Sequence, residues 1–210
     1  TGRSASGVEI LENTRREKEV LERQLAQRSR TFRDDQARSQ VGVTEVAASL
    51  PAGSALVAYT RYEQFDPKEK KGLSTSVPAY MVFVLSSGAK DPEVVVLGDA
   101  LEIDALVTRW RDEVVAGAAE SAKVRGVSGA GHCTAGEALR RKVWDPAASL
   151  LKGRKRVFIV PDGSLNLVSF AALPAGASAF LLEKGPLLHY LSAERDLASP
   201  LTSPWHREGL

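Results

Sequence analysis

The most informative stretch of this 210-residue sequence is Val157-Phe158-Ile159-Val160-Pro161-Asp162-Gly163. Four apolar residues in a row, without alternation, predict a strand that is buried on both faces inside a sheet. Pro161 ends such a strand because it has no amide donor, and Asp162-Gly163 predicts a turn whose glycine accepts a positive φ. Replacing Gly163 by valine is then expected to cost roughly 1–3 kcal/mol through backbone strain. The stretch therefore predicts a central strand that ends in a tight turn.

Three more strands are predicted upstream, at residues 55–59, 80–85 and 93–97, which are short runs rich in β-branched and aromatic residues. The first two are expected to pair as a hairpin across a charged, solvated loop. The third leads into residues 99–102, where Asp and Glu have the spacing of a capping box that opens a helix. We expect one side of that helix to pack on the sheet through its apolar residues, which are Ile103, Leu106, Val107, Trp110 and Val114.

The first 42 residues follow a different pattern. Between residues 8 and 32, apolar positions recur at multiples of three and four among alternating charges, which predicts a long amphipathic helix. Its narrow apolar stripe needs a partner surface, so we interpret residues 1–42 as the helical end of an upstream region. The stripe consists of Leu11, Leu21, Leu25 and Phe32. A polar connector follows, and a short helix capped by Thr44 is expected to run to Leu50.

The amino-acid composition excludes several classes of protein. The chain has 28 basic and 26 acidic residues; the first 42 residues hold 9 and 7 of these, which leaves 19 of each sign in residues 43–210. Such a balance gives no electrostatic footprint for nucleic acid. One cysteine excludes an internal disulfide, and no apolar run is long enough to span a bilayer or to export the chain. We therefore expect a cytoplasmic protein, and the pattern at both ends suggests a piece of a longer chain.

A glycine-rich stretch at residues 126–136 contains the adjacent pair His132 and Cys133. A phosphate-binding loop would need a Lys-Ser or Lys-Thr pair at its end, directly after a strand, and neither condition is met. Neighbouring residues on an extended chain point to opposite sides, and no other Cys or His lies at ligand spacing. We therefore predict a surface loop with Cys133 as a bystander, and we expect no cofactor and no metal site.

The last third contains a series of short motifs in a distinctive order. A helix near residues 139–144 is interrupted at Asp145-Pro146, and the strand and turn at residues 157–166 follow. After them come three apolar segments: Ser169-Phe170-Ala171-Ala172-Leu173, Phe180-Leu181-Leu182-Glu183 and His189-Tyr190-Leu191-Ser192. This series resembles the opening of the CHAT domain, a domain often found behind tetratricopeptide repeats. With upstream pieces such as Leu97-Gly98, the resemblance spans about residues 43–199. One position departs, because the family commonly has proline where Ser169 stands.

The resemblance implies an α/β fold with a caspase-like (pseudo-caspase) layered sheet and flanking helices, preceded by the long amphipathic helix. Residues 43–210 would then be the N-terminal portion of a CHAT domain, truncated before its catalytic half. CHAT domains resemble clan CD cysteine peptidases, in which a His and a Cys form a dyad beside His-Gly and Ala-Cys signatures. Neither signature occurs here, and neither His189, in a predicted strand, nor His206, near the end, matches the family's histidine. The expected catalytic, cofactor-binding and metal-binding residues are therefore none.

The function implied by the resemblance is a non-catalytic half that serves as a platform for a downstream catalytic half. It would also couple that half to protein recognition by upstream helical repeats, so its expected partners are these two regions and a protein substrate or regulator. Nucleic acid and membrane are not expected as partners. Two alternatives remain, a non-enzymatic CHAT-type interaction scaffold and a small-ligand-binding α/β domain. The absence of any convergent polar cluster in the sequence speaks against the second.

Overall fold

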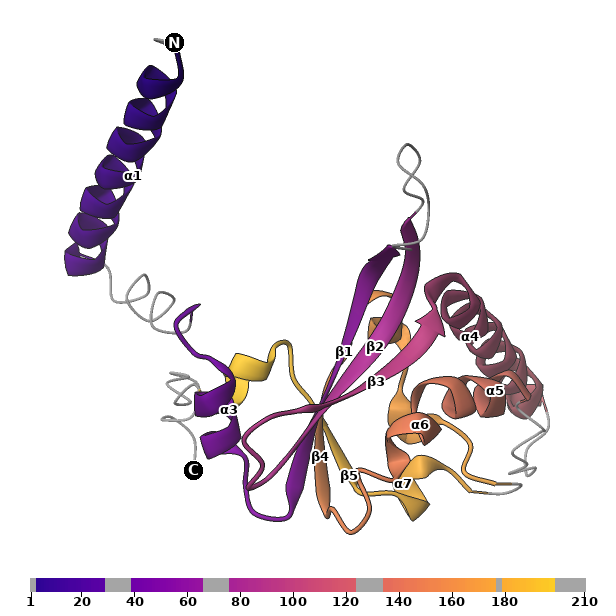
Figure 1. The fold of residues 1–210 in the computed structure, drawn as a ribbon. Helices are drawn as coiled ribbons and strands as arrows, with labels where there is room; N and C mark the ends of the chain where they lie inside the picture. Colours follow the sequence, from indigo (N-terminus) through magenta and orange to yellow (C-terminus); the bar gives the residue numbers. More distant parts are fainter. Residues whose placement is uncertain (1–2, 29–38, 66–75, 124–133, 177–178, 199–210) are drawn as a thin grey trace. The chain divides into compact units, whose positions relative to one another are not determined.

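The computed structural model describes residues 3–28, 39–65, 76–123, 134–176 and 179–198, and the chain divides into two compact units, residues 1–42 and 43–210 (Figure 1). The first unit contains the predicted long helix as α1 (Arg3–Arg28). Charge pairs at i,i+4 spacing line it, such as Glu12 with Arg16 at 3.9 Å. Leu11 of the predicted apolar stripe is 72% exposed. None of the helices in the described part of the chain is long and apolar enough to cross a membrane.

The second unit is built on a five-stranded sheet with the order β3-β2-β1-β4-β5. β1 pairs antiparallel with β2, and β2 pairs antiparallel with β3. β4 is parallel both to β1 and to β5. The strands are β1 (Ser54–Phe65), β2 (Ser76–Ser86), β3 (Glu93–Asp99), β4 (Arg156–Val160) and β5 (Leu187–Tyr190). The predicted hairpin and the predicted α/β sheet with flanking helices are both confirmed.

β4 is the strand predicted from four consecutive apolar residues. It lies between β1 and β5, and Val157, Phe158, Ile159 and Val160 are all buried. Val157 and Ile159 belong to the main core, on the face that carries α4 and α5, whereas Phe158 points to the opposite face. A strand covered on both faces cannot alternate apolar and polar residues, which explains the uninterrupted run.

One face of the sheet packs against α4 (Ala100–Lys123), α5 (Thr134–Val143) and α6 (Asp145–Ala148). The break between α5 and α6 falls at the predicted Asp145-Pro146 position. The start of α4 follows the prediction only in part: Asp99 caps it by accepting a hydrogen bond from the Leu101 amide at 2.7 Å. Glu102 instead reaches Lys142 of α5 at 2.7 Å, so it joins the two helices.

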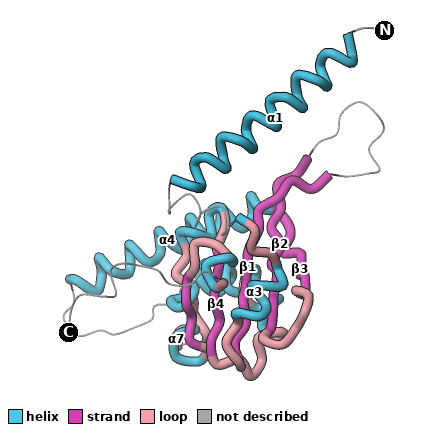
Figure 2. Tube along the Cα trace, turned by 90° about the vertical axis from the view of Figure 1, so that its left-hand side faces the viewer, coloured by secondary structure: helices cyan, strands magenta, loops and turns pink. Residues whose placement is uncertain are grey.

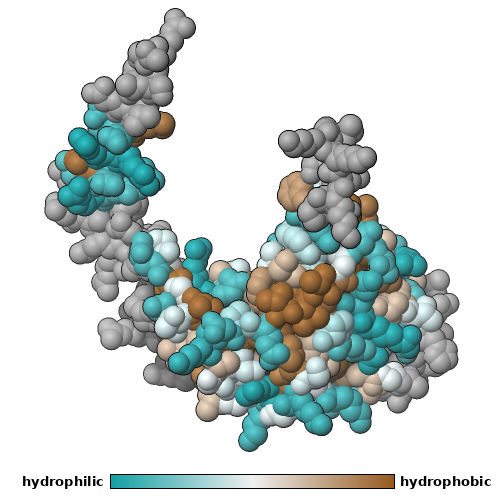
Figure 3. Space-filling model, viewed as in Figure 1, coloured by the Kyte–Doolittle hydropathy of each residue, from teal (hydrophilic) through white to brown (hydrophobic). Residues whose placement is uncertain are grey.

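The opposite face of the sheet is covered only in part. Figures 1 and 2 show α3 (Val43–Ser49) lying over the strands on this side, and it contacts the 3-10 helix η3 (Glu194–Leu197). Leu56 of β1 and Phe158 of β4 are buried there. On β3, by contrast, Val94 and Val96 remain exposed, the latter by 63%. Figure 3 shows apolar side chains gathered beside α3 on the surface of the molecule.

The prediction of a surface loop through Gly136 is wrong at its end, because α5 begins at Thr134 and Gly136 is buried inside it. A Cβ at Gly136 would lie 2.7 Å from Cδ1 of Trp110 and 2.9 Å from Cδ of Pro174. The glycine is therefore needed for close packing between α5, α4 and the segment that follows the 3-10 helix η2 (Phe170–Ala172), and it does not mark a loop. His132 and Cys133 lie outside the described residues, so the rest of that prediction stays untested.

A buried phenol ties the sheet to the end of α5. The Tyr59 hydroxyl donates a hydrogen bond to the Val143 carbonyl at 3.1 Å, and its ring stacks on Phe170 at 5.1 Å between centroids. Burial, assisted by the neighbouring Tyr190, raises the pKa of Tyr59 well above its usual value. The folded state therefore holds this proton at a pH at which the unfolded chain has lost it.

We expect the free energy of unfolding to fall as the pH rises above about 10, the ordinary pKa of tyrosine, because only the unfolded state then releases the Tyr59 proton. The slope contributed by one phenol is about 1.4 kcal/mol per pH unit. A Tyr59→Phe chain lacks this contribution, so its urea-derived unfolding free energy should decline less steeply between pH 9.5 and 11. Equal slopes for the two chains would show that Tyr59 ionises as readily in the folded state.

Candidate functional site

Polar side chains gather where β4 ends. The Asp162 carboxylate accepts hydrogen bonds from two backbone amides, Gly163 at 2.8 Å and Arg61 of β1 at 2.8 Å. It thereby caps the 3-10 helix η1 (Gly163–Leu167). β4 pairs with β1 only up to Ala58. Beyond that point the Asp162 carboxylate, in place of a neighbouring strand, accepts the hydrogen bond of the Arg61 amide. Asp162 is thus the link between the turn after β4 and the far half of β1.

Gly163 fills the one position of this turn where a side chain cannot be placed. Its φ is +54°, as predicted from the Pro-Asp-Gly sequence. A Cβ at this position would overlap the Tyr80 hydroxyl and lie 3.1 Å from Cδ of Arg61. The turn is therefore pressed against β1 and β2, and glycine is required both for its φ and for this close approach.

A hydrogen-bonded network surrounds this contact. The Tyr80 hydroxyl donates to Oδ1 of Asp104 at 3.1 Å and accepts from the Ser164 amide at 3.0 Å. The Ser164 hydroxyl donates to the same Asp104 oxygen, and Nε of Arg61 lies 3.9 Å from Oδ2. Burial raises the pKa of Tyr80 above its usual value, and the hydrogen bonds from Ser164 oppose that shift in part. The network joins β1, β2, α4 and η1.

The chemistry open to this network is limited by its composition. Asp104 orients the Ser164 hydroxyl, but a serine nucleophile also needs a general base such as histidine or lysine within hydrogen-bond reach. None of the hydrogen bonds or ion pairs in the described part of the network involves such a residue. We therefore interpret the network as the device that fixes the turn after β4. Its existence nevertheless corrects the expectation that no polar side chains converge in this chain.

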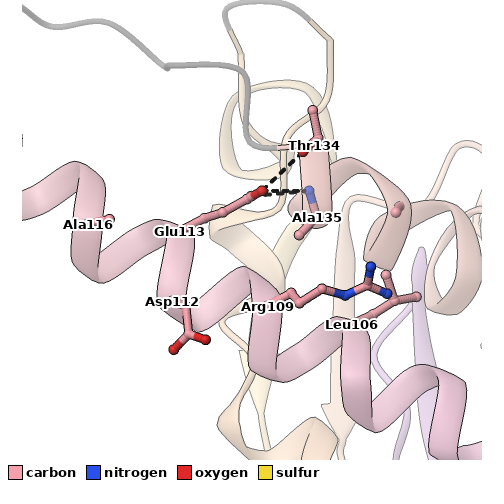
Figure 4. Close-up of a pocket in the computed structure, with 8 residues that line it drawn as sticks. Leu106, Arg109, Asp112, Glu113, Ala116, Thr134 and Ala135 are labelled. Atoms are coloured by element: carbon pink, nitrogen blue, oxygen red, sulfur yellow. Dashed lines mark hydrogen bonds between the residues drawn. The ribbon is translucent and has the colours of Figure 1, made fainter.

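A second feature is a groove of about 590 Å³ between α4 and α5 (Figure 4). Glu113 of α4 points across it, and its carboxylate accepts hydrogen bonds from the Thr134 hydroxyl and the Ala135 amide, each at 3.1 Å. These contacts cap the N-terminus of α5 from a neighbouring helix. Three of the remaining residues that line the groove are apolar and two are charged. The apolar ones are Leu106, Ala116 and Ala138, and the charged ones are Arg109 and Asp112. The Glu113 carboxylate in this groove therefore serves to hold the start of α5 against α4.

His189, a histidine considered from sequence as a possible catalytic residue, lies away from these sites. His189 lies on β5, with its ring 5.5 Å from that of Phe158 on the sheet face opposite the main core. Tyr80 belongs to the main core on the other face, so the sheet separates His189 from the network. His206 lies outside the described residues. Across the described residues, no three His, Cys, Asp or Glu side chains lie together in a way that could hold a metal ion.

Comparison with known proteins identifies one family. Residues 134–208 match the family described as the CHAT domain, a range that runs from the start of α5 past β5 and η3. It thus includes β4, the Pro-Asp-Gly turn, and the Asp162 and Ser164 side chains, while Arg61, Tyr80 and Asp104 lie before it. No curated protein and no solved structure matches the chain.

Proposed function

We propose that the chain is the non-catalytic N-terminal half of a CHAT-domain cysteine peptidase, because residues 134–208 match the CHAT domain. CHAT domains resemble caspase-like peptidases, whose dyad lies beside His-Gly and Ala-Cys signatures that this sequence lacks. The role left for this half is that of a platform on which the catalytic half packs. A cytoplasmic location and a coupling to upstream helical repeats through residues 1–42 belong to the same proposal.

The observation that carries this proposal is the match at residues 134–208, and the outer edge of β5 supports it. β5 is the last strand in the sheet order, and among the described strands only β4 pairs with it. Leu187 is 58% exposed. A short edge strand with an exposed apolar side chain can pair with a further strand, so the sheet can continue into another half of the domain.

The purified 210-residue chain is expected to cleave no peptide, because its sequence supplies no dyad. Fluorogenic peptide libraries with acidic and with basic residues before the cleaved bond provide the measurement, with and without iodoacetamide. The complete protein, treated in the same way, is expected to show cleavage that alkylation removes.

Two outcomes would change the proposal. Cleavage by the 210-residue chain alone, lost on alkylation, would place a catalytic thiol in this half, and Cys133 is the one cysteine that could supply it. A complete protein that cleaves nothing, yet retains a partner in pull-down through the CHAT unit, would favour the alternative of a non-enzymatic interaction scaffold.

A further inference from the structure

We propose that the open edge of β1 at residues 61–65 binds an extended peptide segment of a partner protein as an added strand, with Arg61 recognising an acidic side chain of that peptide. This binding does not rest on peptidase activity or on the CHAT assignment. Exposed strand edges are used for peptide recognition elsewhere, because main-chain hydrogen bonds supply affinity and alternate side chains supply specificity.

The edge is open because the two neighbours of β1 have different lengths. β2 pairs with β1 as far as Phe65, which faces Ser76, whereas β4 pairs with it only from Ser54 to Ala58. The hairpin therefore extends past the end of β4, with β3 still paired to β2 as far as Ala79 (Figure 1). Within the part of the chain that the structure describes, no strand lies beside β1 on that side after Ala58.

Two hydrogen bonds fix which backbone groups face this edge. The Gly53 carbonyl accepts from the Lys155 amide at 3.0 Å, and the Arg61 amide donates to Asp162 at 2.8 Å, so odd-numbered residues point toward β4 and its turn. Backbone groups alternate in direction along a strand. The Arg61 carbonyl, both groups of Glu63 and the Phe65 amide therefore point outward, and no described residue is hydrogen-bonded to them.

The side chains at this edge define the peptide that fits it. Arg61, Glu63 and Phe65 share one face of the strand, since side chains alternate with a period of two. The Arg61 side chain is 37% exposed, and its closest carboxylate contact is the 3.9 Å approach of Nε to Asp104, which leaves the outer guanidinium nitrogens available. Phe65 is 62% exposed. A peptide strand that complements this edge has an acidic side chain opposite Arg61, a basic one opposite Glu63 and an apolar one opposite Phe65.

A second copy of this chain fits the edge poorly. Two copies of β1 paired antiparallel about Glu63 would place that carboxylate directly opposite its own equivalent. Like charges in direct cross-strand positions destabilise a sheet. The charge pattern therefore favours a partner with a different sequence.

The binding experiment uses the 210-residue chain and a fluorescein-labelled seven-residue peptide, with threonine at alternate positions and glutamate, lysine and valine between them. The peptide and its reversed sequence are both titrated by fluorescence anisotropy, since either strand direction could pair. Methylation of the peptide amides that face β1 should weaken binding at least about tenfold, because it removes the main-chain donors. Glutamine in place of glutamate should weaken it about fivefold, as for loss of an exposed ion pair.

Variants of the chain provide the reciprocal test. Glu63→Pro removes an outward-facing amide without removing a hydrogen bond to β2, so binding should be lost while the thermal midpoint changes little. Glu63→Ala retains the amide and should retain most of the affinity. Arg61→Gln should weaken binding of the glutamate peptide about fivefold and leave that of the glutamine peptide unchanged.

The proposal is overturned if neither peptide binds, or if the N-methylated peptide binds as well as the parent, a result that does not depend on any variant folding. Equal effects of Arg61→Gln on the glutamate and glutamine peptides would remove the acidic recognition. A dimer in light scattering that Glu63→Pro dissolves would make a second copy the occupant and would also overturn it. None of these results touches the proposed function, because no cleavage is measured.

Discussion

The chain with valine in place of Gly163 is expected to lose about 3–5 kcal/mol of unfolding free energy. A β-branched residue at a φ of +54° is strained by roughly 1–3 kcal/mol. In addition, its Cβ would overlap the Tyr80 hydroxyl, so that Tyr80 must move. That movement breaks its hydrogen bonds with Asp104 and Ser164, each worth about 1 kcal/mol. Urea unfolding followed by circular dichroism measures the loss.

Gly153 provides a matched control. Its φ is +78°, but a Cβ placed on it meets no atom within 4 Å. Gly153→Val should therefore carry the backbone strain alone and lose less stability than Gly163→Val. The difference between the two glycine variants should shrink when both are made in a Tyr80→Phe chain, which lacks the obstructing hydroxyl. Equal losses at Gly153 and Gly163 would show that the contact with Tyr80 has no energetic weight.

The parts of this fold that follow from sequence are those encoded by a few neighbouring residues. The interior position of β4 follows from four consecutive apolar residues, and the positive φ of Gly163 follows from Pro-Asp-Gly. The break between α5 and α6 follows from Asp145-Pro146 in the same way. In each case one local rule, on burial, turn geometry or helix breaking, is sufficient.

What the sequence does not reveal depends on distant partners. Gly136 has the sequence context of a flexible loop, yet it lies in α5, at a position where Trp110 and Pro174 leave no room for a side chain. The polar contacts at the end of β4 join residues as far apart as 101 positions in the case of Arg61 and Asp162. In the sequence, each residue of the network has the features of an ordinary strand, helix or turn residue. Only the folded chain brings them to one place, so their convergence could not be predicted from spacing.

Asp162→Ala is expected to lower the free energy of unfolding by about 2 kcal/mol. The change leaves the amides of Gly163 and Arg61 without their acceptor, and hydrogen bonds to a charged group contribute about 1.5–3 kcal/mol each when buried. Water can replace part of this loss, because the site is partly exposed. Asp162→Asn keeps one carbonyl oxygen and can satisfy one of the two amides, so it should lose about half as much. Chemical unfolding of the unsubstituted, Asp162→Asn and Asp162→Ala chains measures the order of their unfolding free energies.

The same substitution, made in the complete protein, separates a scaffolding role for the turn from a catalytic one. In the proposed platform, Asp162 acts on the fold by joining β1 to the turn after β4, so the fraction of protein that remains folded should retain its turnover per molecule. Asp162→Asn should then show intermediate stability and the same turnover. Turnover that disappears in Asp162→Ala while the unfolding free energy is unchanged would make the carboxylate part of the active site. That result would refute the assignment of the Pro-Asp-Gly turn to the scaffold.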